Sequence, residues 1–383
     1  MPIRANKRFG LRSVAAAAQA AARTPPAVAI TGLDAWAVRA SPSASPRLMV
    51  AVRAGEGLTG YGETSGGRDP RTAAQRMLSY SEVLEGRDAL ASEAVRGVLS
   101  EAPAEVRGAI DIALLDLRGK IAEAPVYDLL AGRTRDKARA MAALPGAAEP
   151  ALMEQVAAAR AEGFRAFSVP LSVPLDVPTR GRAFFASTEA TLTRLREGGA
   201  DDLVLDCSGQ ATAAEAAGLA ARLERFHLMW MDEPTSEISD QALRKISHES
   251  VTPVGWGRHL LSGDRFQDLL RMQVVDVVRP DVGLHGISGT RKIAALAEAY
   301  YTAVAPFHRG GPIGTAAALQ VAASVPNFVV QEIAYSADDA ERQMDEAIAG
   351  GSQPRVTDGF FELPSGPGLG IEVDEDALRE YAA

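Results

Sequence analysis

Cysteine is almost absent from this chain, and its absence limits the classes of protein to which the chain can belong. Cys207 is the only cysteine among 383 residues, so neither a disulfide framework nor a cysteine-rich zinc site can form. Long apolar runs are also missing, because no stretch approaches the roughly 18 apolar residues of a membrane span. The sequence therefore predicts a globular protein without a membrane partner, and we expect it in the cytoplasm.

Positive charge is in deficit. The chain has 40 Lys and Arg residues against 49 Asp and Glu residues, for a formal net charge of −9. This balance argues against a nucleic-acid partner. No dinucleotide, flavin or pyridoxal signature occurs, so we expect no organic cofactor. A small-molecule ligand is the partner class that remains.

The N-terminal segment has no acidic residue before Asp34. A basic start followed by an alanine-rich run at 14–22 has the outline of a targeting peptide. Alanine is only weakly apolar, however, and Gln19 interrupts the run. We interpret residues 1–26 as an N-terminal extension, with a targeting peptide as the alternative.

The residues that follow, 27–136, have the pattern of a small α+β domain. Stretches of strand type at 27–40, 48–53 and 58–64 precede helical patterns. The clearest helix follows Pro103. Its apolar residues share one face at the 3.6-residue period: Val106, Ala109, Ile110, Ala113, Leu114, Leu117 and Ile121.

Residues 137–340 show regular alternation of short apolar runs and helical patterns. Eight candidate strands lie at 139–144, 164–173, 202–206, 228–231, 252–256, 274–278, 301–305 and 328–331. Seven helical patterns separate them, which predicts parallel strands closed into a (β/α) barrel. An open doubly wound sheet is the alternative, but no glycine-rich fingerprint follows the first strand. We expect the tail at 341–383, rich in Gly and Pro, to return to the first domain.

Side chains able to bind a metal ion or to transfer a proton follow several of these strands. They lie at the end of the barrel where catalysis occurs in this architecture. Asp206 and Glu233 end neighbouring strands, as oxygen ligands of a hard cation would, although helix-capping carboxylates are the alternative. Asp281 and His308 also end neighbouring strands and could form a dyad in which the carboxylate orients a general base. Glu332 ends the last strand.

Several short motifs resemble one family. They are Gly60-Tyr-Gly-Glu-Thr64, the helix at 109–120, Asp232-Glu-Pro234, Arg279-Pro-Asp281 and Gly311-Pro-Ile-Gly314. On these residues the chain resembles the mandelate racemase/muconate lactonizing enzyme branch of the enolase superfamily, and within it the acid-sugar dehydratases of the galactonate type. The resemblance implies an α/β fold: a modified (β/α)7β TIM-like barrel with an α+β capping domain formed by the N-terminal region and the C-terminal tail.

The resemblance also implies a chemistry. Members remove the proton α to a carboxylate, and Mg²⁺ held by three strand-end carboxylates stabilises the enolate. Asp206 and Glu233 match the first two metal ligands. The third position falls on Arg258, which cannot ligate a cation. Arg258 would instead bind the substrate carboxylate or form a fork with Asp206 or Glu233, which weakens the case for Mg²⁺ without excluding it.

Only some of the catalytic bases of the family have a matching residue in this sequence. The Lys-x-Lys positions fall on Ser168 and Pro170, and no lysine occurs between 137 and 245, so Ser168 is left as a candidate substrate contact. Asp281 matches the acid of the dyad and Glu332 the carboxylate of strand eight. Ungapped alignment through Gly311 puts Phe307 at the base position, and a shift of one residue gives His308. His285 is a second candidate base, with a core or surface role as its alternative.

Two functions follow from these residues. The first is a lyase or isomerase that abstracts the α-proton of a small hydroxy acid or acid sugar. The second is a metal-free, non-catalytic barrel that binds a carboxylate or acts in assembly, with Asp206, Arg258 and Glu233 as a structural ion network. In either case we expect a homo-oligomer.

Overall fold

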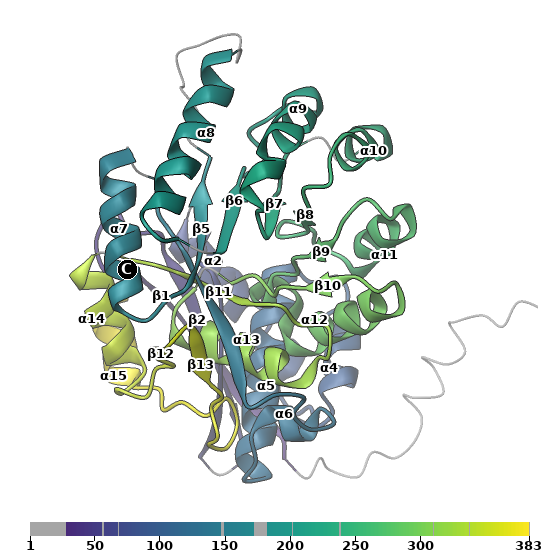
Figure 1. Ribbon diagram of the computed structural model, residues 1–383. Helices are drawn as coiled ribbons and strands as arrows, with labels where there is room; N and C mark the ends of the chain where they lie inside the picture. Colours follow the sequence, from purple (N-terminus) through teal and green to yellow (C-terminus); the bar gives the residue numbers. More distant parts are fainter. Residues whose placement is uncertain are drawn as a thin grey trace, which may run out of the picture.

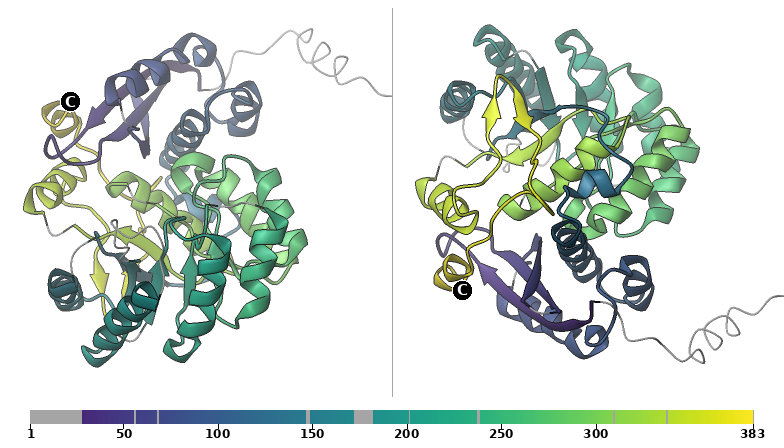
Figure 2. Two further views of the ribbon diagram at one scale, coloured as in Figure 1. Left: turned by 90° about the horizontal axis from the view of Figure 1, so that it is seen from above. Right: turned by 90° about the horizontal axis from the view of Figure 1, so that it is seen from below.

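The computed structural model describes residues 28–382 apart from 56, 68, 147–148, 172–181, 201, 237–238, 309 and 337. The expected N-terminal extension, residues 1–26, lies outside the described residues. Two units follow along the chain, an N-terminal α+β domain and a barrel, and Figure 2 shows them packed against one another.

The N-terminal unit is a capping domain built on an antiparallel sheet. Its strands pair in the order β1-β2-β3, and α5 packs on β3. The strands are β1 (Ile30–Val38), β2 (Arg47–Ala54) and β3 (Leu58–Ser65). The helices are α2 (Pro70–Leu78), α3 (Ser81–Leu84), α4 (Ser92–Val98), α5 (Ala104–Ile121) and α6 (Val126–Leu129). The apolar face predicted for the helix after Pro103 is that of α5.

Two glycines of the Gly60-Tyr-Gly-Glu-Thr64 motif allow α5 to approach β3 closely. A Cβ atom added at Gly62 would lie 2.0 Å from the carbonyl oxygen of Ala109, and one at Gly60 would lie 2.0 Å from that of Ala113. Backbone atoms cannot give way as a flexible side chain can. The motif therefore sets the distance between sheet and helix.

Gly62→Ala should lower the free energy of unfolding by at least roughly 1–3 kcal/mol, because the added methyl group overpacks a backbone contact. Gly97→Ala is the matched control: Gly97 lies in α4 and has no atom within 4 Å of its added Cβ. That change should stabilise the helix by about 0.5–1 kcal/mol. Urea unfolding measures both variants, and equal stabilities for the two would contradict the close approach.

Over its described residues, the second unit is a closed barrel of eight parallel strands alternating with seven helices, which confirms the predicted architecture. Helices surround the strands in Figure 1. The strands are β4 (Lys137–Ala143), β5 (Ala166–Pro170), β6 (Asp202–Asp206), β7 (Trp230–Asp232), β8 (Val254–Trp256), β9 (Val277–Val278), β10 (Ala303–Val304) and β11 (Gln331–Ala334). The helices are α7 (Glu149–Ala161), α8 (Arg182–Glu197), α9 (Ala213–Leu223) with the short 3-10 helix η1 (Glu224–Phe226), α10 (Asp240–Glu249), α11 (Gly263–Met272), α12 (Val282–Ala299) and α13 (Pro312–Ser324).

One layer of apolar side chains fills the barrel below the site. It consists of Met141, Ala166, Val204, Trp230, Val277, Ala305 and Val330, all buried. Because side chains alternate along extended chain, the residue two positions further on each strand points the same way. The layer above this core therefore receives Ser168, Asp206, Asp232, Arg279, Phe307 and Glu332.

The C-terminal tail contacts both units. It contains α14 (Asp339–Ile348), β12 (Val356–Thr357), β13 (Phe360–Glu362) and α15 (Glu375–Glu380). β13 pairs antiparallel with β4 and so extends the barrel sheet. The end of the chain then reaches the capping domain, where the Arg39 amide donates to the Tyr381 carbonyl oxygen at 3.2 Å. The tail thus covers part of the barrel before it completes the capping domain.

The described helices include none with the length and apolar character required to cross a bilayer.

Candidate functional site

A buried ion network lies at the carboxyl ends of the barrel strands. Arg258, two residues after β8, donates from Nη1 and Nη2 to the two carboxylate oxygens of Asp206 at 2.9 and 2.6 Å. This two-bond fork is the strongest geometry for such a pair. The Nε atom of Arg258 also lies 3.4 Å from Asp232. Burial alone would lower the pKa of Arg258, but the carboxylates of Asp232 and Asp206 raise it above its usual value.

Glu233 is held by backbone amides rather than by the arginine side chain. Its Oε1 atom accepts hydrogen bonds from the amides of Gly257 and Arg258 at 2.7 and 2.8 Å. Burial, followed by the nearby charge of Asp232, raises the pKa of Glu233 to about 7. Asp206, Glu233 and Arg258 are therefore brought together, as their positions at strand ends predicted.

Arg279 extends the network across the barrel, and the sequence analysis assigned it no role. Its Nε donates to Asp232 at 3.1 Å, its Nη1 donates to the Ala305 carbonyl oxygen at 2.9 Å, and its Nη2 donates to Glu332. The side chains of Arg279, Asp232 and Glu332 are completely inaccessible to solvent. A charged residue directly after the apolar pair of β9 was the sequence signal, since arginine is almost never fully buried without a partner.

Phe307 covers both guanidinium groups. The Arg258 and Arg279 guanidinium carbons lie 5.1 and 5.7 Å from the centre of its ring, within the range of cation–π attraction. Its position two residues after Ala305 of the barrel core makes it point inward. Phe307, which ungapped alignment puts at the family's base position, therefore lies on the two arginines, and His308 is the alternative for that position.

His308 points instead towards the capping domain. Its Nε2 atom lies 3.8 Å from the Glu63 carboxylate of β3, beyond hydrogen-bonding distance, and has no hydrogen-bond partner among the described residues. Glu63 also accepts from the amides of Gly311 and Gly314 at the start of α13. Burial would raise the pKa of Glu63, but His308 and Arg47 lower it below its usual value. The sequence analysis noted the motif of Glu63 but not this contact.

Asp281 caps the start of α12, where it accepts from the Gly283 amide at 2.7 Å. Burial raises its pKa to about 6, and the charge of His308 acts in the opposite direction. The backbones of Asp281 and Phe307 form a parallel bridge, so Asp281 and His308 belong to neighbouring strand ends.

The two remaining candidates lie in different surroundings. His285 is inside α12, with Nε2 at 2.8 Å from the Leu260 carbonyl oxygen and its ring edge-on to Phe266. Burial lowers its pKa to about 4, so it is neutral at physiological pH and engaged in the core. Ser168 is buried in β5, and its Oγ has no hydrogen-bond partner among the described residues.

The donor set does not fit Mg²⁺ as the resemblance implies it. Both oxygens of Asp206 accept from Arg258, and Oε1 of Glu233 accepts two backbone amides. A guanidinium at the third position adds positive charge where a ligand would need negative charge. Within the described part of the chain, no group of three or more His, Cys, Asp or Glu side chains is arranged to hold a metal ion.

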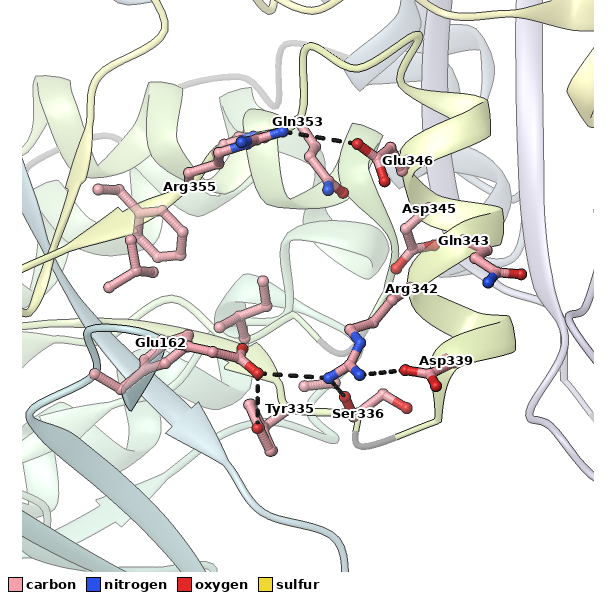
Figure 3. A pocket seen from close by; sticks show the side chains of 16 residues that line it. Glu162, Tyr335, Ser336, Asp339, Arg342, Gln343, Asp345, Glu346, Gln353 and Arg355 are labelled. Carbon is pink, nitrogen blue, oxygen red and sulfur yellow. Dashed lines mark hydrogen bonds and ion pairs between the residues drawn. The ribbon is translucent and has the colours of Figure 1, made fainter. Parts of the chain in front are cut away.

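A cavity of about 570 Å³ lies elsewhere, between α14, β12 and the residues before β5. Figure 3 shows Arg342 and Tyr335 directed at Glu162, at 3.4 and 3.0 Å, and Arg355 beside Glu346. The cavity shares no residue with the strand-end network. Most of its charged side chains form ion pairs, Asp345 with Arg47 outside the cavity and Arg342 with Glu162 and Asp339 inside it, so the strand ends are the better candidate for chemistry.

Comparisons with known proteins agree with this architecture. Residues 37–131 match the mandelate racemase/muconate lactonizing enzyme N-terminal domain, and residues 151–377 match the enolase C-terminal domain-like family. D-galactonate dehydratase of Xanthomonas oryzae is 30% identical over 88% of this chain and 91% of that enzyme, and D-xylonate dehydratase of Haloferax volcanii is 28% identical over 88% and 85%. A mandelate racemase/muconate lactonizing enzyme-like protein from Rubrobacter xylanophilus superposes with a TM-score of 0.84 at 26% identity, over 94% of this chain and 98% of that one.

Proposed function

The chain belongs to the mandelate racemase/muconate lactonizing enzyme family of the enolase superfamily, and on that premise we propose that it is a dehydratase-like lyase acting on a small hydroxy acid or acid sugar. The observation that carries this proposal is the buried Nε2 of His308, which has no hydrogen-bond partner among the described residues. A histidine is the side chain that most often serves as a general base, and no described residue occupies this nitrogen.

Each remaining residue has a role in this reaction. His308 removes the α-proton, and Asp281 stabilises the imidazolium that forms. Arg258 places a permanent positive charge near the substrate carboxylate, Ser168 contacts the hydroxyl groups, and Glu332 positions Arg279 beneath them. The His308 imidazolium then returns its proton to the β-hydroxyl, which leaves as water, and the enol product tautomerises to a 2-keto acid. No step is assigned to a metal ion.

A second function is favoured by Phe307. Because this ring covers both guanidinium groups from the base position, the same network could serve a barrel that binds a carboxylate without turnover. Fold alone does not distinguish the two, since one fold supports many functions.

The test is incubation of the purified protein in D2O with acid sugars, including D-xylonate and D-galactonate, followed by proton NMR. The lyase proposal expects loss of the α-proton signal and growth of a 2-keto product. Binding of an acid sugar, measured by calorimetry, with neither exchange nor product would favour the second function and reject the first.

The exchange rate should depend on pH through Asp281. Since burial raises its pKa to about 6, its carboxyl group is neutral below that pH and cannot stabilise the imidazolium. The rate should therefore rise as the pH increases through about 6. Asp281→Asn, measured across the same pH range, should lose this step, and a step that persists in the variant would assign it to another group.

A further inference from the structure

The strongest disagreement between this barrel and its family concerns positive charge at the strand ends. The carboxylate expected to hold a cation, Asp206, already holds the guanidinium of Arg258 through two hydrogen bonds. A second guanidinium, Arg279, bridges Asp232 and Glu332. Asp232 lies between the two arginines and interacts with both.

The two arginines behave as one dication. Both are almost completely buried, and the same Phe307 ring covers both. Guanidinium groups keep their protons at any physiological pH, so the two charges are permanent. They are also preorganised, because two carboxylates hold each guanidinium group: Asp206 and Asp232 hold Arg258, and Asp232 and Glu332 hold Arg279.

The charge balance matches that of a metal centre. Three carboxylates around one divalent cation leave a net charge of −1. Asp206, Asp232 and Glu332, the three carboxylates that contact the two guanidinium groups, leave the same charge, and Glu233 beside them is held by backbone amides. A developing negative charge on a ligand would meet fixed positive groups in surroundings of low dielectric constant.

We propose that Arg258 and Arg279 together take the place of the divalent cation in this barrel. The two guanidinium groups then supply the positive charge at the strand ends, and the chain folds without a metal ion. The proposal rests on the proposed function only for the identity of the anion that the pair faces, a substrate carboxylate. Its test reads metal binding and stability, so it stands or fails separately from turnover.

The experiment is thermal unfolding of the full chain with MgCl2 and with EDTA. Wild type should unfold at one temperature in both. Arg258→Glu, which places a third carboxylate beside Asp206 and Glu233, should unfold several degrees higher with MgCl2 than with EDTA, because a ligand that binds only the folded state raises its stability.

Arg139→Glu is the matched control. Arg139 pairs with Asp202 at the opposite end of β6, so the change also adds a carboxylate beside an aspartate, but at the surface. It should show no response to Mg²⁺. If Arg258→Glu folds only with MgCl2, recovery of its native circular dichroism on adding the metal counts as support.

Two results would overturn the proposal. One is stabilisation of wild type by MgCl2 that EDTA reverses, which would show that a metal site persists beside the arginines. The other is a folded Arg258→Glu variant that does not respond to Mg²⁺. If Arg258→Glu folds in neither solution, the proposal is judged by the unfolding temperatures of wild type in MgCl2 and in EDTA.

Discussion

Arg279→Met is expected to lower the free energy of unfolding by about 3–5 kcal/mol, the cost of removing one partner from a buried ion pair. Methionine fills much of the volume of the arginine stem but removes the hydrogen bonds that Arg279 donates to Glu332 and Asp232. Both carboxylates are inaccessible to solvent, so water cannot replace the lost donors. Urea unfolding followed by circular dichroism measures the change.

Arg139→Met is the control for this prediction. The ion pair of Arg139 with Asp202 is about one-third exposed on each side, and its loss should cost no more than about 1 kcal/mol. Adding Glu332→Leu to Arg279→Met should recover part of the lost stability, because it removes the buried carboxylate that Arg279 neutralised. Equal losses in the Arg139 and Arg279 variants would contradict the burial of the network.

His308→Ala should reduce α-proton exchange by roughly 10²–10⁴-fold, the usual contribution of a positioned general base. The measurement is the exchange rate in D2O with an acid sugar that wild type accepts. The Nε2 of His308 has no hydrogen-bond partner among the described residues. The fold should therefore tolerate its loss better than the reaction does.

His285→Ala separates catalysis from packing. His285 is also buried, but its Nε2 lies at 2.8 Å from the Leu260 carbonyl oxygen and its ring packs on Phe266. Its removal should destabilise the fold while the exchange rate per folded molecule stays near that of wild type. An unchanged rate in His308→Ala, or an equal loss in both variants, would remove His308 from the proposed mechanism.

The strand ends were predictable, whereas the partners of their side chains were not. Alternation of apolar runs with helical patterns placed Asp206, Arg258 and Glu332 at one end of a barrel, because parallel strands carry their carboxyl ends to the same edge. The family resemblance, which put Arg258 at the third ligand position, gave a fork with Asp206 or Glu233 as one of the options for that side chain. The choice between Asp206 and Glu233 as partner depends on rotamers and on the amides after β8, which the linear sequence does not show.

Residues that act across units were harder to find. Arg279 was quoted only as part of a motif, because its partners Asp232 and Glu332 lie 47 and 53 residues away in the chain. Glu63 meets His308 only after the capping domain docks on the barrel. Ungapped alignment put Phe307 at the base position, but the position of its ring over both guanidinium groups could not be predicted from the sequence. The metal-free site, the homo-oligomer and the cytoplasmic location stay predictions.

The shared construction of the capping domain has a consequence for synthesis on the ribosome. Arg53 of β2 contacts Glu375 of α15, 322 residues later, and Val38 bridges to Ala382. The capping sheet is therefore synthesised before the barrel, but it cannot pack against α15 until the barrel has also been synthesised. Contacts so distant in sequence form slowly, and the open edge of β1 meanwhile exposes backbone groups that favour aggregation. Nascent chains stalled within the barrel should thus engage chaperones through the capping sheet.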